Sequence, residues 1–448
     1  MAVRRFDFTE GNILCQMVAY SLPIFLTNVL QASYQFVDSL WVGNLLGSNA
    51  LASVSVSGTI IFTILSFIIG MNGATLTILA QRKGAGDERG LQESLNAFVV
   101  VFALLAISLG LIGYVLSPYI LTWIGTPDTI HKLATEYLQV NALGIVFLFG
   151  YNFIGTVLRA LGDSRTPIRF VLAAVILNTV LDPLFIAGFH MGVVGAAAAT
   201  ILSQGLSFVY ALIYTKRTGK IPFTKPHRPD KQYAATIFRL GIPAGLQMML
   251  ISGGMMAVIS IVNSFGEDVV AGFGAAQRMD SLIMLPILTL GSAVTSMAGQ
   301  NIGAGKWERV NGVTRSGIGL IMSISAIIAV VVYVFAPAML GWFVENPAAI
   351  HFGAAYLRTV CLFYPFLGIN FVLNGVIRGA GAMLAVLVLN FISFWVLRYP
   401  LSALFSRWLG ESGIAYGMGV SFLLSAGFAV LYYRLGSWKR VRIVGSRQ

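Results

Sequence analysis

The stretch Ile13 to Val42, ILCQMVAYSLPIFLTNVLQASYQFVDSLWV, decides how the rest of the chain is interpreted. Its roughly 30 residues would form a helix of about 45 Å, longer than a hydrocarbon core of about 30 Å. Pro23 removes a helix hydrogen bond and predicts a bend. Asp38 is a carboxylate in apolar surroundings, which costs about 2.5–3.5 kcal/mol at the bilayer centre. Gln31, Tyr34 and Asp38 share one helix face, so we expect a bendable membrane helix that lines a cavity.

The composition is typical of a polytopic membrane protein. Hydrophobic residues make up 57% of the 448 positions, charged residues make up 10%, and the mean hydropathy is +0.82. Cys15 and Cys361 lie in apolar spans without disulfide or metal-ligand spacing, and the four histidines lie in or near predicted loops. The first apolar run is too long for a cleavable signal peptide, and no small-residue cleavage site follows it.

Hydropathy predicts an all-α protein with twelve membrane spans. We expect them at residues 13–42, 49–80, 94–117, 133–157, 166–187, 191–215, 234–262, 269–298, 313–335, 351–376, 383–405 and 412–435.

The basic residues behind the net charge of +12 are distributed unevenly between the two sides of the predicted membrane topology. The N-terminus, the C-terminus and the loops on their side of the membrane hold 24 of the 29 lysines and arginines. Loops on the other side hold only Lys132 and Arg407. This bias predicts that both termini are cytoplasmic. The basic charge therefore orients the protein, contact with anionic lipid is a secondary alternative, and no nucleic-acid partner is expected.

Five sequence matches indicate that a six-span unit is duplicated. QRKGAGD (81–87) reappears as QNIGAGK (300–306), and LRALGDS (158–164) as IRGAGAM (377–383). EYLQ (136–139), SLPIFL (21–26) and GVVGAAAAT (192–200) match AYLR (355–358), GIPAGL (241–246) and GIAYGMGVS (413–421). All five offsets fall between 219 and 221 residues, as expected of a repeat.

The repeat predicts two six-helix bundles, residues 1–215 and 234–448, joined by a cytoplasmic linker at 216–233. Because each copy has an even number of spans, the copies share one orientation, as in transporters with parallel repeats. A substrate site between the halves and alternating access by rocking are then expected. A duplication that serves structure alone is the alternative.

Only Asp38, Asp182 and Asp280 of the acidic residues fall well inside spans. Such carboxylates are functional candidates. Asn178 and Asp182 are neighbours on one helix face, and Asp38, Asp182 and Thr200 are predicted at similar depth. This oxygen-rich set suits a hard cation such as Na⁺, or two carboxylates that share a proton. Passive, hydrated carboxylates are the other interpretation.

Asp280 is interpreted differently, because Arg278 lies two residues away. We expect the two to neutralise each other or to pair with neighbouring spans, in a structural role. The repeat takes Asp38 to Val258 and Asp182 to Tyr399, so ion coupling is expected in the N-terminal half. No HExxH, GxSxG, Walker or DDxxD motif is present, which argues against an enzyme and against a bound cofactor.

The doubled six-span unit, Pro23 and Asp38, N178TVLDPLF185 and Thr200 resemble the multidrug and toxic compound extrusion (MATE) family, within it the DinF-like prokaryotic branch. The resemblance covers essentially the whole chain. It implies a V-shaped pair of six-helix lobes around a central cavity, in the inner (plasma) membrane of a prokaryote. It also implies efflux of small organic, often cationic and amphipathic, compounds in exchange for H⁺ or Na⁺, by a protein that functions as a monomer.

The resemblance assigns roles to individual residues. Asp38, Asn178, Asp182 and Thr200 match the proton or cation site, and Pro23 matches the bend of the first helix. Polar positions that line the substrate cavity are matched by Gln31, Tyr34, Asn152 and Ser203. Span seven, LQMMLISGGMMAVISIV (246–262), lacks the carboxylate found in another branch, which argues against a Na⁺ site there.

Two alternatives to drug export are considered. A flippase for a lipid-linked saccharide would need several cationic residues facing its cavity, and Arg278, Arg358 and Arg398 are the candidates. A membrane receptor or scaffold would need neither intramembrane carboxylates nor a doubled bundle.

Overall fold

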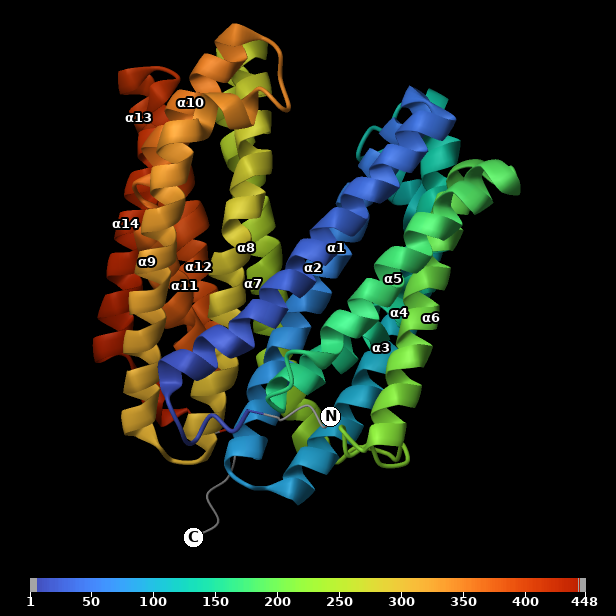
Figure 1. The fold of residues 1–448 in the computed structure, drawn as a ribbon. Coiled ribbons are helices and arrows are strands. Elements are labelled where there is room, and N and C mark those ends of the chain that lie inside the picture. Colours follow the sequence, from blue (N-terminus) through green and yellow to red (C-terminus); the bar gives the residue numbers. More distant parts are fainter. Residues whose placement is uncertain (1–5, 442, 444–448) are drawn as a thin grey trace. The chain divides into compact units, whose positions relative to one another are not determined.

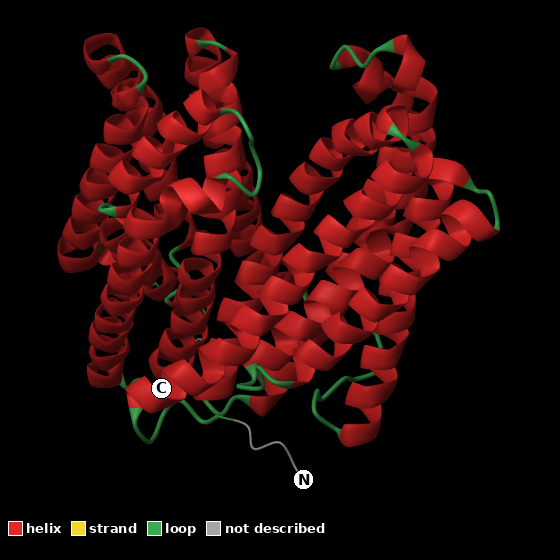
Figure 2. Ribbon diagram, turned by 45° about the horizontal axis from the view of Figure 1, so that its top comes forward, coloured by secondary structure: helices red, strands yellow, loops and turns green. Residues whose placement is uncertain are grey.

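The computed structural model describes residues 6–441 and 443, and its regular structure in this part of the chain consists of helices only (Figure 2). Four of the basic residues assigned to the cytoplasmic side, Arg4, Arg5, Arg442 and Arg447, lie outside the described residues. Hydrogen bonding within each helix satisfies the backbone without water, which is the requirement inside a bilayer.

The first half of the chain forms six long helices and one short π-helix (Figure 1). They are α1 (Ile13–Leu46), α2 (Ser48–Gly84), α3 (Glu88–Trp123), α4 (Asp128–Ala160), α5 (Thr166–Pro183), η1 (Leu184–Gly188, π) and α6 (Gly192–Thr218). The segment between α6 and the next helix, residues 219–230, is not helical. It begins at Gly219, whose φ of 60° ends α6 in the left-handed region that glycine adopts without strain.

The second half repeats this plan with more interruptions. Its elements are α7 (Lys231–Val262), η2 (Asn263–Phe265), α8 (Glu267–Gly303), α9 (Trp307–Leu340), α10 (Pro347–Cys361), α11 (Tyr364–Gly379), α12 (Met383–Phe391), η3 (Ile392–Arg398, π), α13 (Tyr399–Leu409), α14 (Ser412–Leu435) and η4 (Ser437–Arg440).

Among the described residues, eleven helices are long and apolar enough to cross a membrane, or twelve if one bent pair counts as a span. The bent pair is α10 and α11, which meet at 53°. The predicted span 351–376 corresponds to this bent pair and not to one straight helix. Pro365 lies in the first turn of α11 and supplies no backbone N–H, so the helix restarts there instead of continuing.

The chain divides into two compact units, and the division does not simply separate the first half of the sequence from the second. The first contains Phe6, Leu22–Leu79 and Asp87–Arg239, and the second contains Asp7–Ser21, Ala80–Gly86 and the chain from Leu240 onward. Helix α1 therefore passes from one unit to the other between Ser21 and Leu22, directly before Pro23.

The N-terminal segment belongs to the second unit because side chains of α8 and α9 bind its backbone. Asn301 donates to the carbonyl oxygen of Phe8 at 3.0 Å, and Arg309 donates to the carbonyls of Phe8, Glu10 and Gly11. The aromatic ring of Phe8 is fully buried and packs edge-on against Tyr20. These bonds satisfy backbone groups that the short segment cannot satisfy itself.

The repeated glycine motif explains how the ends of α2 and α8 pack within the second unit. A Cβ atom on Gly84 would lie 1.9 Å from the carbonyl oxygen of Gln300, and one on Gly303 would lie 2.0 Å from that of Gln81. The two helix ends therefore meet backbone to backbone at equivalent positions of the two repeats. Gln81 also donates to the carbonyl oxygen of Gly379 at 2.7 Å.

Alanine at Gly84 or Gly303 should destabilise the protein by forcing the two backbones apart. We expect each variant to lose about 1–3 kcal/mol of unfolding free energy, the usual cost of overpacking, and to melt at a lower temperature in detergent. Gly319→Ala is the control, because its Cβ would meet open space. An equal response of Gly84→Ala and Gly319→Ala would contradict the close contact.

Candidate functional site

Two polar side chains lie one turn apart at the end of α5. Asn178 Nδ2 donates to Asp182 Oδ1 at 2.9 Å, and both side chains are fully buried. The remaining oxygens, Asn178 Oδ1 and Asp182 Oδ2, have no hydrogen-bond partner. Pro183 ends the regular helix, and the π-helix η1 follows at once. Such single-turn π-helices are frequent at functional sites.

Asp38 brings a second carboxylate to the same place from α1. Its side chain is 8% exposed, and its Oδ1 has no partner. The carboxylate is close enough to Asp182 for their negative charges to repel each other. One turn further along α1, Val42 packs into an apolar cluster that includes Tyr137 of α4 and Ile186 of η1. This cluster holds the ends of α1, α4 and η1 together.

Thr200 and Tyr34 complete the set. The Oγ1 of Thr200, on α6, and the hydroxyl of Tyr34, on α1, are buried atoms without a hydrogen-bond partner. The Tyr34 hydroxyl lies beside Thr200 and feels the charges of Asp38 and Asp182. The first unit thus brings residues of α1 together with residues of α5 and α6 that lie more than a hundred positions later in the sequence.

The chemistry of this set is that of a site that lacks one positive charge. A buried carboxylate without a compensating partner is costly, and two adjacent ones repel each other. A proton on one carboxylate, or a hard cation held by the two carboxylates, the amide oxygen and the hydroxyl, would remove that cost. Within residues 6–441, no group of three or more His, Cys, Asp or Glu side chains could hold a metal, so a cation here would need the neutral oxygens.

The remaining predicted cavity residues lie on α1, α4 and α6 of the same unit. Gln31, on α1, is exposed and lies near the hydroxyl of Tyr151. Asn152 is partly exposed and donates to the carbonyl oxygen of Leu148, one turn earlier in α4. Ser203 is fully buried, and its hydroxyl donates to Ala199 within α6 at 2.6 Å.

Tyr34 was selected from the sequence, but a second tyrosine near the carboxylates, Tyr137, was not. Tyr137, on α4, is 5% exposed, lies within electrostatic range of Asp38 and Asp182, and interacts with the side chain of Asn141. The signal was available in the repeated EYLQ motif, which was used only as a marker of duplication.

A buried ion pair fixes the helices that carry the site. Asp163, before α5, accepts hydrogen bonds from the backbone N–H and the hydroxyl of Thr166. Lys220, after α6, binds the same carboxylate at 2.6 Å. Burial alone would raise the pKa of Asp163, but the bonds from Lys220 and Thr166 outweigh it and lower the pKa. The pair ties the start of α5 to the end of α6.

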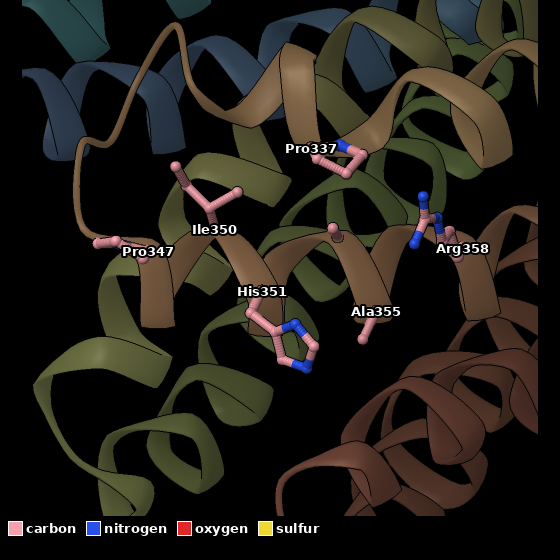
Figure 3. Close-up of a pocket in the computed structure, with 7 residues that line it drawn as sticks. Pro337, Pro347, Ile350, His351, Ala355 and Arg358 are labelled. Carbon is pink, nitrogen blue, oxygen red and sulfur yellow. The ribbon is translucent and has the colours of Figure 1, made fainter.

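A cavity of about 330 Å³ lies elsewhere, at α9 and α10 of the second unit (Figure 3). Pro337, His351 and Arg358 are among its lining residues, and none of the predicted site residues is. The Nε of Arg358 donates to the carbonyl oxygen of Tyr333 at 2.9 Å, and its guanidinium lies over the ring of the same residue.

The fold and the site define a multi-pass membrane protein built from a doubled helical unit, with a buried acidic site in its first copy. The chain belongs to the MatE family, whose model matches it twice, at residues 23–184 and 243–404. The two matches lie 220 residues apart, within the range of offsets found from the sequence. The members of this family are transporters and not enzymes.

Individual relatives agree with this assignment. The chain is 55% identical to the probable multidrug resistance protein YpnP of Bacillus subtilis (strain 168), over 98% of this chain and 99% of that protein. It is 30% identical to YoeA of the same strain, over 97% and 96%. A solved structure of a multidrug resistance MATE family transporter, in an outward-facing conformation, has a TM-score of 0.91 at 24% identity, over 98% of this chain and all of that chain. This last likeness shows the fold.

Asp163→Asn should destabilise the protein in a pH-dependent manner. Because the folded pKa is below the ordinary value of 3.8, the bond stabilises the fold fully above that pH and is lost as the pH falls through the lowered pKa. At neutral pH we expect a loss of about 1.5–3 kcal/mol, as for hydrogen bonds to charged groups, measured by thermal unfolding in detergent.

The matched control is Glu136→Gln, which removes an exposed pair with Lys132 at 4.0 Å. Its effect should stay below about 1 kcal/mol. The difference between Asp163→Asn and the wild type should shrink once the pH falls below 3.8. A difference that does not change with pH would refute the ion pair as its cause.

Proposed function

We propose that this protein is a secondary active multidrug exporter that moves small organic compounds, often cationic and amphipathic, out of the cell in exchange for H⁺ or Na⁺. The observation that carries the proposal is the pair of buried carboxylates, Asp38 and Asp182, each with an unpartnered oxygen. The names of the relatives as multidrug resistance proteins support the substrate class.

The exchange follows from a shared site. An organic cation or the coupling ion neutralises the carboxylates, with Asn178 and Thr200 as further oxygen ligands for Na⁺. Each ligand removes the charge that attracts the other, and linkage requires the reduction in affinity to be reciprocal. Gln31, Tyr34, Asn152 and Ser203 would contact the organic substrate. Protonation or Na⁺ binding in the outward-facing state therefore expels the substrate outward.

The bend of α1 is proposed to connect ion binding to the shape of the cavity. Pro23 is buried, and directly before it the chain leaves the second unit and enters the first. The carbonyl of Pro23 accepts a bond from Thr27. Because a helix with an internal proline lacks one backbone bond, it bends there at lower cost than elsewhere. Asp38 lies about four turns further along the same helix and would transmit its charge state to the bend.

The remaining expectations complete the proposal. Two six-helix lobes, residues 1–215 and 234–448, are joined by the linker 216–233 and alternate in access, with both termini in the cytoplasm. The protein would act as a monomer in the plasma membrane of a prokaryote, as a member of the DinF-like branch. The LRALGDS and NTVLDPLF motifs support that branch.

Asp38→Asn and Asp182→Asn should each abolish export driven by an ion gradient, because the amide can neither carry the proton nor supply the negative charge that attracts a cation. Uptake of a fluorescent cation into inverted vesicles should fall at least about tenfold, with ΔpH and Na⁺ varied independently to identify the ion. Asp128→Asn, an exposed acid at the start of α4, is the control. Near-normal export by both site variants would rule out this assignment.

A further inference from the structure

A second buried polar cluster lies in the second unit, where Asp280 of α8 meets α10 and α11. The hydroxyls of Tyr364 and Tyr356 donate to its carboxylate, the latter at 3.5 Å. Arg278, one of the two partners expected for Asp280, instead lies over the ring of Phe343 at 5.8 Å. Residues two apart on a helix do not face each other, so Asp280 is paired from neighbouring helices.

Arg398 of η3 carries the positive charge of this cluster. Its side chain is 3% exposed, and it feels the charge of Asp280 although the two form no salt bridge within 4.0 Å in the described chain. Its Nε makes one long contact of 3.5 Å to Ser421, and its Nη2 has no partner. The rings of Phe394 and Phe422 lie 3.8 and 4.8 Å from the guanidinium carbon.

The repeat relates this cluster to the acidic site of the first unit. The offset of 219 takes Tyr137 to Tyr356, and the offset of 221 takes Thr200 to Ser421. Tyr137 lies within electrostatic range of Asp38, and Tyr356 within range of Asp280. The hydroxyl of Thr200 lies beside Tyr34, and that of Ser421 lies 3.5 Å from Nε of Arg398. Aligning Pro183 with Pro400 places Arg398 next to the counterpart of Asp182, which is Tyr399.

The second copy of the unit thus also carries a polar cluster beside these positions, but its charged residues are not the repeat equivalents of Asp38 and Asp182. A π-helix accompanies each site, η1 directly after Pro183 and η3 directly before Tyr399 and Pro400. Two carboxylates occupy the first site, whereas one carboxylate and one guanidinium occupy the second. A site with a different set of charges is suited to a different ligand group.

An arginine with a purely structural role would form a salt bridge with the nearby carboxylate, because a buried N–H without a partner costs about 1–3 kcal/mol. The hydroxyls of Tyr356 and Tyr364 already donate hydrogen bonds to the Asp280 carboxylate, and Nη2 of Arg398 has no acceptor. Aromatic rings over a guanidinium leave its N–H edge free, and that edge matches the two oxygens of a carboxylate. Asp280 is the partly exposed member of the cluster and so marks its point of access.

We propose that this cluster is a second ligand site, at which Arg398 binds the carboxylate group of an organic zwitterion and Asp280 lies beside its positive end. A simple anion would be repelled by Asp280, and a simple cation by Arg398, whereas a zwitterion satisfies both. Phe394 and Phe422 supply apolar contact for an aromatic body. This site extends the proposed substrates beyond cations and does not depend on exchange at Asp38 and Asp182.

Equilibrium binding of a matched dye pair tests the site without any ion gradient. The probes are a xanthylium dye with a free carboxylic acid, which is a zwitterion at neutral pH, and its methyl ester, which is a cation. Fluorescence anisotropy of the full chain in detergent should show that Arg398→Gln weakens binding of the acid at least about tenfold, the loss of a charge-assisted bond. Binding of the ester should change less than about twofold.

Arg358→Gln is the control, because it removes another arginine of the second unit that lies outside the cluster, and it should alter neither affinity. The double variant Asp280→Asn/Arg398→Gln removes both charges and leaves none unpaired, so it should fold and still lose binding of the acid. The proposal is overturned if the wild type does not bind the acid. It is also overturned if Arg398→Gln weakens both dyes alike, or if the double variant binds the acid as the wild type does.

Discussion

The free-energy cost of an unpaired charge away from water is the constraint on which the acidic site of this protein depends. Asp38 and Asp182 lie in the first unit with oxygens that no protein group satisfies. A stable fold tolerates such a site where a mobile positive charge supplies the missing partner. In the proposed mechanism, exchange is a consequence of electrostatics, because two different cations that need the same carboxylates must displace each other.

The scaffold keeps these carboxylates in place with contacts that are themselves uncharged or locally neutralised. Asp163 and Lys220 join the ends of α5 and α6. Small residues let α4 and α6 approach closely: Gly144 has the side chain of Ile201 in the space a Cβ would need, and Gly150 has that of Phe208. The acidic site is therefore held by a rigid frame, while Pro23 leaves α1 with one point of lower bending cost.

Much of the fold was predictable from hydropathy and repetition. The membrane spans, the duplication and the family follow from periodic apolar runs and from motifs such as QRKGAGD. The bend at Pro365 was missed because an apolar run gives length but not direction. The packing of residues 7–21 with the second unit depends on bonds from Asn301 and Arg309, nearly three hundred positions away, which no local pattern reports.

The sites were predictable to a lesser extent. Asp38, Asn178, Asp182 and Thr200 could be selected because carboxylates and their helical neighbours are rare in apolar spans. Tyr137 could not be distinguished from an ordinary core aromatic. Its equivalent Tyr356 contacts Asp280, which shows that one repeat can be used to interpret the other. Of the two expectations for Asp280, pairing with neighbouring spans is the one observed, because residues two positions apart do not face each other on a helix surface.

The most direct test of the central claim is ion release on binding of an organic cation to the purified protein in weakly buffered detergent. The account predicts that binding releases H⁺ in sodium-free solution, or that affinity falls as Na⁺ is raised, and that Asp38→Asn/Asp182→Asn shows neither effect. A wild-type protein that binds the cation with one affinity at every pH and Na⁺ concentration, and releases no proton, would contradict a shared site.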